Sequence, residues 1–359
     1  MHVRVGSLLV QEGGVDRRQP VEVALGHEKL GYIGPRMAVV TNSIERLLLA
    51  APRGYCAGVD RAVQTVERAL EIHGPPVYVR KEIVHNKHVV SELRERGAIF
   101  VEEETAVPEG AVCVFSAHGV APSVRAGAQR RGLRTIDATC PLVTKVHREA
   151  VRFAGEGYTV VLVGHDGHEE VEGTMGEAPE RIVLVESERD AEELEVEDPE
   201  RIAYITQTTL AVDETSSILA RLRERFPRIV GPRTDDICYA TTNRQMAVKQ
   251  MADHCDLLLV IGSRNSSNSQ RLVEVARDCG TEAHLIDTAG EVREEWLTGR
   301  RVVGISSGAS APENLVQELV GFFRARGVRD ISEFHVIEED VRFMLPKPIR
   351  EAVTAGEAS

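Results

Sequence analysis

The chain of 359 residues contains no apolar run that approaches the ~20 residues needed to cross a bilayer. Its N-terminus also lacks the charged and then apolar pattern of a secretory signal. These absences predict a cytoplasmic protein with no membrane partner. Hydrophobic residues make up 42% of the chain, the content of an ordinary globular core, and the length is enough for two or three domains.

Close pairs of cysteines and an excess of positive charge are also missing. The six cysteines stand far apart, which fits a reducing compartment better than a disulfide framework. The formal net charge of −13 argues against nucleic acid as a partner. An anionic ligand would therefore need a site built locally from particular side chains.

Three cysteines stand in the same local context, between an apolar run and a helix-like sequence. Cys56 lies in "LLLAAPRGYCAGVDRAV", Cys140 in "RTIDATCPLVTKVHREAV" and Cys238 in "TDDICYATTNRQMAV". A helix N-terminus lowers the pKa of a thiol beside it, which suits a metal ligand or a nucleophile. A small side chain packed under a turn would be the simpler interpretation of one such cysteine. Three of them favour a shared site.

The spacing of these cysteines indicates an internal repeat. Cys140 follows Cys56 by 84 residues and Cys238 follows Cys140 by 98, far too long for a zinc finger but the size of a small α/β unit. After each cysteine, two apolar runs end in polar residues, as in "YTVVLVGHDGHEEVEG" and "RIAYITQTTLAVDETS". Short strands alternating with helices predict parallel sheets, whose ligands bind at the carboxyl ends of the strands.

We therefore expect an α/β protein of three similar small parallel-sheet domains, arranged with pseudo-threefold symmetry around the thiols. The expected domains are residues 56–139, 140–237 and 238–347. Each strand before a cysteine should close the sheet of the preceding unit, so strand 46–55 should join the third domain. Residues 1–45 are expected to form an extension outside the core, and residues 348–359 a loose tail.

Several motifs together resemble the 4-hydroxy-3-methylbut-2-enyl diphosphate reductases. They include "APRGYCAGVDRA", "FSAHGV", "DATCPLVTKVH", "GHDGHEEVEGTMG", "TQTTL", "DDICYATTNRQ" and "GSRNSSNSQRL". The resemblance covers roughly residues 46–347 in order. One departure is Glu169, where many family members have proline, which places an extra charge in that loop.

The resemblance implies a 4Fe-4S cluster held by Cys56, Cys140 and Cys238, the same three residues that the repeat singles out. Its fourth iron would be open to the substrate and would act as a Lewis acid while the cluster supplies electrons. The other cysteines lack the turn context, and we expect them to be core or surface thiols: Cys113, Cys255 and Cys279.

A diphosphate site is expected at "SSNS", which offers hydroxyls, an amide and backbone N–H groups in a short span. Taken alone, this stretch is equally typical of a solvated turn. The family resemblance favours binding, with histidines that would add positive charge. The expected substrate-binding residues are His85, His118, His168, Thr208, Ser266, Ser267, Asn268 and Ser310.

The loop "GHDGHEEVEG" contains a HxE pair without the PCxxC partner of a zinc deaminase. By resemblance, Glu170 delivers protons, while His168 and Thr208 arrange the substrate hydroxyl and the hydrogen-bond relay. The neighbouring Glu169 and Glu172 are expected to form an ordinary solvated acidic loop.

The expected reaction is the reductive dehydration of (E)-4-hydroxy-3-methylbut-2-enyl diphosphate to isopentenyl and dimethylallyl diphosphates, with two electrons and two protons. A ferredoxin or flavodoxin would donate the electrons, through a basic patch such as "RAGAQRRGLR". Two alternatives remain open at this point. The three cysteines could hold catalytic zinc in a hydrolase acting on a phosphorylated small molecule, or the protein could be a non-enzymatic iron-sulfur sensor.

Overall fold

The structure, a computed structural model, describes residues 44–357. The expected N-terminal extension, residues 1–45, therefore lies outside the described residues except for its last two. Strands and helices alternate along most of the described chain, except that α7 is followed directly by α8, and every strand pairing in it is parallel. No helix in this part of the chain is long and apolar enough to cross a bilayer.

The first sheet has the strand order β3-β2-β4-β5. Its strands are β2 (Val77–Arg80), β3 (Ala98–Val101), β4 (Val112–Phe115) and β5 (Arg134–Asp137). Its helices are α1 (Ala57–His73), α2 (Lys87–Glu95) and α3 (Pro122–Arg130), with a 3₁₀ turn at Glu104–Ala106. Strand β4 is buried at every position, as its short apolar sequence VCVF predicts for a strand covered on both faces.

The second sheet has the order β7-β6-β8. Its strands are β6 (Thr159–Val163), β7 (Ile182–Val185) and β8 (Ile202–Thr206). Its helices are α4 (Pro141–Gly155), α5 (Glu169–Met175), α6 (Glu188–Glu193) and α7 (Val212–Arg225). A single parallel bridge between Ala203 and Val230 brings the chain that leads to Cys238 against β8.

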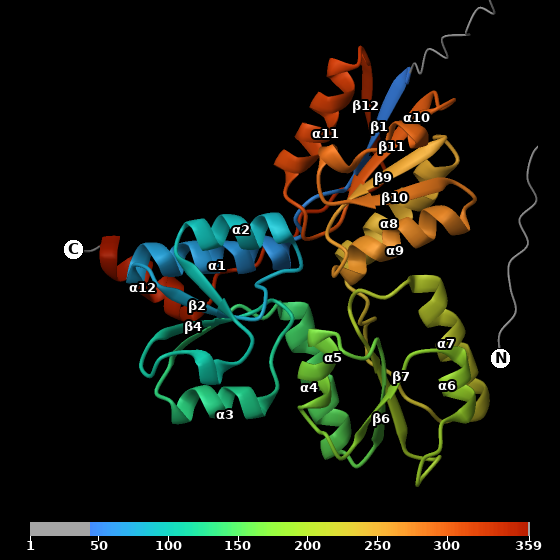
Figure 1. Cartoon of the computed structure of the whole chain (residues 1–359). Coiled ribbons are helices and arrows are strands. Elements are labelled where there is room, and N and C mark those ends of the chain that lie inside the picture. The colour runs from blue at the N-terminus through green and yellow to red at the C-terminus, as the bar shows by residue number, and fades with distance from the viewer. Residues whose placement is uncertain (1–43, 358–359) are drawn as a thin grey trace, which may run out of the picture. The chain divides into compact units, whose positions relative to one another are not determined.

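The third sheet has the order β10-β9-β11-β1-β12. Its strands are β1 (Arg46–Ala51), β9 (Leu257–Ile261), β10 (Glu282–Ile286), β11 (Val302–Ser307) and β12 (Asp330–His335). Its helices are α8 (Tyr239–Ala252), α9 (Ser267–Asp278), α10 (Glu294–Leu297) and α11 (Glu313–Ala325), with a 3₁₀ turn at Ala289–Glu291. Figure 1 shows the blue strand β1 between the orange and red strands of this sheet.

The strand before Cys56 thus belongs to the sheet that is otherwise built from the end of the chain. In its register, Leu47 lies opposite Val303 on one side and Ile331 on the other. Leu47 is fully buried, within a core cluster that includes Leu257. The strand before Cys140, β5, lies in the first sheet in the same way. Three small parallel-sheet α/β units confirm the expected fold class, and we propose the boundaries 56–139, 140–237 and 238–347 for them.

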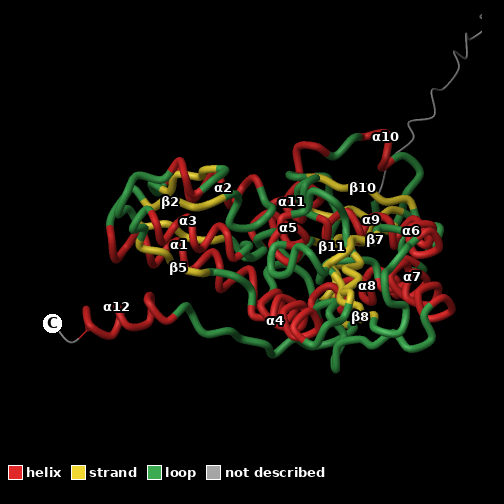
Figure 2. Tube along the Cα trace, turned by 90° about the horizontal axis from the view of Figure 1, so that it is seen from below, coloured by secondary structure: helices red, strands yellow, loops and turns green. Residues whose placement is uncertain are grey.

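The expectation of a loose tail over residues 348–359 is wrong for its described part. Helix α12 spans Lys347–Glu357 and packs on α1. Ile349 is fully buried in the core cluster of the first unit, and Val353, one helical turn later, packs against the same cluster. Figure 2 shows the long loop that leads to α12. Two apolar residues at i and i+4 are too short a signal to read as a docked helix from sequence.

Candidate active site

Each of the three cysteines is the residue immediately before a helix. Cys56 precedes α1, Cys140 precedes α4 and Cys238 precedes α8. Pro141 occupies the first turn of α4, where its missing N–H leaves no bond unmade. In α8 the backbone N–H of Thr241 donates to Cys238 Sγ at 3.4 Å. The unpaired N–H groups that begin a helix therefore lie next to each thiol.

The backbone holds the three cysteines in equivalent ways. Each cysteine N–H donates to a carbonyl in a loop that follows a strand of the preceding unit. The pairs are Cys56 with Ala309 (3.2 Å), Cys140 with Ala117 (2.9 Å) and Cys238 with Thr208 (3.0 Å). Because the same contact recurs three times, each thiol is placed by two neighbouring units at once.

The three thiols line one pocket. Gly58 lies beside two of them, since a Cβ at this position would stand 2.6 Å from Cys140 Sγ and 3.8 Å from Cys56 Sγ. A side chain at position 58 would therefore occupy the space where the thiols meet. The remaining cysteines are elsewhere: Cys113 is buried in β4, Cys255 is partly buried and Cys279 is exposed.

The expected lowering of the thiol pKa is wrong for two of the free thiols. Burial, together with the neighbouring Cys56 thiol, raises the pKa of Cys140 to about 12 and that of Cys238 to about 11. Hydrogen bonds from the helix starts oppose this rise but do not overcome it. A cation beside Cys140 and Cys238 would favour their thiolate forms, which burial and the neighbouring thiol disfavour.

The polar residues expected in the site come from the carboxyl ends of strands in all three units and line the same pocket. His85 follows β2, His118 follows β4, His168 follows β6, Thr208 follows β8, Ser266 to Asn268 follow β9 and Ser310 follows β11. The described structure thus brings together all the residues that the sequence analysis selects. Parallel strands achieve this because their carboxyl ends share one edge of each sheet.

The three histidines form a cluster, and burial disfavours the positive charge expected of two of them, His85 and His168. The His85 and His118 rings stack with centroids 4.0 Å apart, and His168 meets both edge-on. Burial and the neighbouring His118 lower the pKa of His168 to about 3, and the same causes lower that of His85. His168 Nδ1 accepts the backbone N–H of Glu170 at 3.1 Å, as a neutral ring can.

Asn268 offers an amide that the protein itself leaves unpaired. It is 5% exposed, and neither Oδ1 nor Nδ2 has a partner within the described structure. Nearby, Ser310 Oγ donates to the carbonyl of His85 at 3.0 Å and lies 3.4 Å from Ser266 Oγ. A buried amide without a partner is costly, so its position in the pocket favours a polar ligand.

Glu170 lies in the first turn of α5 and is 2% exposed. The backbone N–H of Thr208 donates to Oε1 at 2.7 Å, and the Thr208 hydroxyl lies 2.9 Å from Oε2. Burial raises the pKa of Glu170 to about 7, even though both contacts with Thr208 favour the carboxylate. The side chain can therefore hold and release a proton near neutral pH.

The expectation of a solvated acidic loop is wrong for Glu169. Its side chain is 15% exposed and forms an ion pair with His118 Nδ1 at 3.1 Å, whereas Glu172 is 52% exposed and pairs with Lys81. Neighbouring positions of α5 thus place the Glu169 carboxylate against His118 and the Glu172 carboxylate in solvent. Phe343 also lines the pocket, from the loop before α12, and no local sequence pattern indicates this role.

The fold and the pocket define a class of protein: an α/β enzyme that places three thiols beside a protonatable carboxyl group. The comparisons with known proteins identify the family within that class. The chain belongs to the LytB protein family, whose model matches residues 47–324.

Curated relatives and solved structures agree with this assignment. A 4-hydroxy-3-methylbut-2-enyl diphosphate reductase of Leifsonia xyli is 60% identical over 310 residues, covering 86% of this chain and 92% of the relative. The corresponding reductase of Streptomyces avermitilis is 56% identical over 324 residues, covering 90% and 96%. The structure of the E-1-hydroxy-2-methyl-but-2-enyl-4-diphosphate reductase of Plasmodium falciparum matches with a TM-score of 0.85 and 37% identity, covering 87% of this chain and 99% of that one. The resemblance seen in the sequence motifs is therefore confirmed.

Proposed function

We propose that the protein is the oxidoreductase that reduces (E)-4-hydroxy-3-methylbut-2-enyl diphosphate to isopentenyl and dimethylallyl diphosphates. Two electrons and two protons enter for each substrate, and the hydroxyl leaves as water. The observation that carries this proposal is the meeting of three thiols with Glu170 and Thr208 in one pocket, in a chain whose relatives bear the name of this reductase. This reaction is the last step of the methylerythritol phosphate route to isoprenoids.

The residues of the pocket fit an iron-sulfur cluster. Cys56, Cys140 and Cys238 would hold a 4Fe-4S cluster and leave one iron without a protein ligand. Gly58 supports this fit because its missing side chain keeps open the space between two of the thiols. When bound, the cluster supplies electrons and an open iron that weakens the allylic C–O bond as a Lewis acid.

The polar wall of the pocket would bind the diphosphate. Ser266, Ser267, Asn268 and Ser310 lie at the end of the third sheet, and His85 and His118 at the end of the first. The unpaired amide of Asn268 is the strongest support, since it can bond to phosphate oxygens without losing another partner. A substrate held here would direct its hydroxyl end away from this wall and toward the thiols.

Glu170 would supply the proton that the departing oxygen needs. Burial raises the pKa of its carboxyl group to about 7, and Thr208 contacts both of its oxygens. His168 is fixed by its bond from the Glu170 N–H, which leaves its other ring nitrogen for the substrate hydroxyl. The chain thus separates diphosphate binding from proton delivery within one pocket.

The test is analysis of anaerobically purified protein, followed by reduction of the substrate with an artificial electron donor. We expect iron and sulfide in a ratio near one and both isomeric diphosphate products. Colourless protein with one zinc and no sulfide would instead support the zinc hydrolase, and a cluster without turnover would support the sensor. Neither alternative has support among the relatives, which carry the name of the reductase.

Gly58→Ala should sharply lower the iron and sulfide content of the protein. The added Cβ would stand 2.6 Å from Cys140 Sγ, and overpacking of this kind costs about 1–3 kcal/mol. Gly321→Ala in α11 is the matched control, because a Cβ there meets no atom within 4 Å. Equal iron content in the two variants, measured after identical anaerobic purification, would show that position 58 does not border the cluster.

Asn268→Ala should raise KM for the diphosphate by roughly 10- to 100-fold, because a bond to a charged oxygen contributes about 1.5–3 kcal/mol. Turnover at saturating substrate should change much less. Steady-state kinetics with an artificial donor measures both values, and Asn314→Ala is the control at an exposed asparagine outside the pocket lining. An unchanged KM in Asn268→Ala would mean that "SSNS" only begins helix α9 and does not bind the diphosphate.

The electron donor is proposed to be a small acidic carrier such as ferredoxin or flavodoxin. Three arginines of the expected basic patch are engaged within the protein, since Arg125 pairs with Asp137, and Arg131 and Arg134 donate to backbone carbonyls. A shallow hollow beside Arg125 also includes Arg61 and Lys347. Arg61 donates to the carbonyl of Thr139, the residue before Cys140, so a carrier bound here would approach a cluster ligand. A cytoplasmic location is part of the same proposal.

A further inference from the structure

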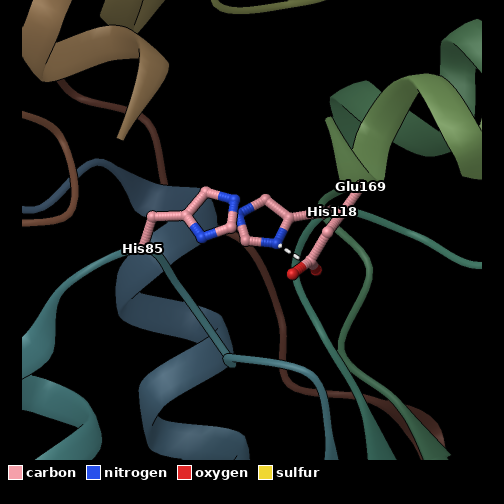
Figure 3. Close-up of side chains that lie close together, drawn as sticks. All are labelled: His85, His118 and Glu169. Carbon is pink, nitrogen blue, oxygen red and sulfur yellow. Dashed lines mark hydrogen bonds and ion pairs between the residues drawn. The ribbon is translucent and has the colours of Figure 1, made fainter. Parts of the chain in front are cut away.

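His85, His118 and Glu169 bring three potential metal ligands together at the edge of the pocket. One ligand atom from each residue can be chosen so that all three lie within 4.8 Å of one another. Figure 3 shows the two rings side by side and the Glu169 carboxylate against His118. Their side chains are 12%, 15% and 15% exposed, so the group is shielded but open to exchange.

The donor atoms of these three groups suit one kind of metal ion. Two imidazoles and one carboxylate match zinc, whereas magnesium prefers an all-oxygen site.

A second layer of contacts orients His85. Glu82 Oε2 lies 3.3 Å from His85 Nδ1, and Asn265 Nδ2 donates to the same carboxylate oxygen at 2.7 Å. A carboxylate on one ring nitrogen leaves the other nitrogen as the ligand, the arrangement usual for metal-bound histidines. His168 lies beside the group, but its Nδ1 already accepts the Glu170 N–H.

We propose that His85, His118 and Glu169 bind a zinc ion in the substrate-free protein, and that the ion and the substrate diphosphate exclude each other. The second part rests on the proposed function, because it assigns the two histidines to the diphosphate. Glu169 belongs only to the metal site, since a carboxylate repels phosphate oxygens. The site would make the enzyme sensitive to free zinc, with substrate as the protecting ligand.

Zinc binding can be measured without turnover, by equilibrium dialysis of the anaerobic, cluster-containing protein against buffered free zinc and metal analysis. We expect about one zinc per chain, and Glu169→Gln should weaken its binding by at least tenfold, since loss of even an outer-shell partner of a metal ligand costs roughly 10- to 100-fold. Glu172→Gln is the matched control, with the same change of charge on the same helix but at an exposed position. Equal zinc binding in the wild type and Glu169→Gln would overturn the site. Iron and sulfide content confirms that both variants carry the cluster.

Competition is tested by steady-state kinetics at fixed free zinc. Zinc should raise KM and leave turnover at saturating substrate unchanged in the wild type and in Glu172→Gln, with a much smaller rise in Glu169→Gln. Zinc that binds through Glu169 without raising KM would support the metal site but overturn the exclusion, and with it the assignment of the histidines to diphosphate. A protein without reductase activity would refute the proposed function and leave the dialysis result intact.

Discussion

Glu170→Gln should lower turnover by roughly 10²- to 10⁴-fold, the usual contribution of a general acid. Hydroxide is a poor leaving group, so the departing oxygen needs a proton as well as coordination. Glutamine keeps the shape of the side chain, and its amide can still meet both the N–H and the hydroxyl of Thr208. Cluster assembly and substrate binding should therefore persist while proton delivery fails.

The pH dependence follows from the same residue. Burial raises the pKa of Glu170 to about 7, so the protonated, donating form is present below that pH and is lost above it. In the wild type, kcat/KM should therefore fall by about tenfold per pH unit above this pKa. That limb should disappear in Glu170→Gln, whose residual rate cannot depend on this proton.

The measurement is steady-state reduction with an artificial donor from pH 6 upward, alongside iron content and substrate binding. Glu172→Gln, on the exposed side of the same helix, controls for the loss of one negative charge. A kcat near the wild-type value in Glu170→Gln, with an intact cluster, would remove Glu170 from the mechanism. The proton source would then have to be His168 or a substrate phosphate.

Replacement of Cys56, Cys140 or Cys238 by serine should abolish most cluster binding and reduce activity to a small fraction of the wild type. A serine hydroxyl does not provide the thiolate ligand that holds iron in such clusters. Each of the three lies at a helix start and is fixed through its backbone by a neighbouring unit, so no other cysteine can take its place.

The matched controls are the cysteines outside the pocket. Cys279→Ser is at an exposed position and should have little effect, while Cys113→Ala in buried β4 should cost some stability without loss of iron. Iron and sulfide analysis, the visible absorption spectrum and thermal unfolding separate these effects. Equal loss of iron from both groups of variants would contradict the assignment of the three ligands.

Local pattern was enough to predict much of the fold. Cys140 followed by Pro141 marks a helix start by itself, because proline is suited to the first turn. Short apolar runs such as VCVF in β4 predict buried parallel strands. The recurrence of one cysteine in each unit predicts three similar units. These features depend on residues near one another in the chain, and so a sequence states them directly.

The position of the polar residues at the carboxyl ends of parallel strands was also predictable from the sequence. His85, His118 and Thr208 follow strands of different sheets, yet each stands at the edge where ligands bind. The sequence therefore determined which residues could meet. It could not determine the spacing of their side chains, since no local pattern fixes how one unit packs on the next.

Only the tertiary structure decided the charge states and the new contacts. Burial raises the pKa of Cys140 and lowers that of His168. Both shifts disfavour the charged forms that the sequence led us to expect. Glu169, which reads as a solvated carboxylate, pairs with His118 from another unit, and Ile349 turns a predicted loose tail into a docked helix. Burial and desolvation are properties of the assembled units, whereas helix starts and strand ends are properties of the local chain.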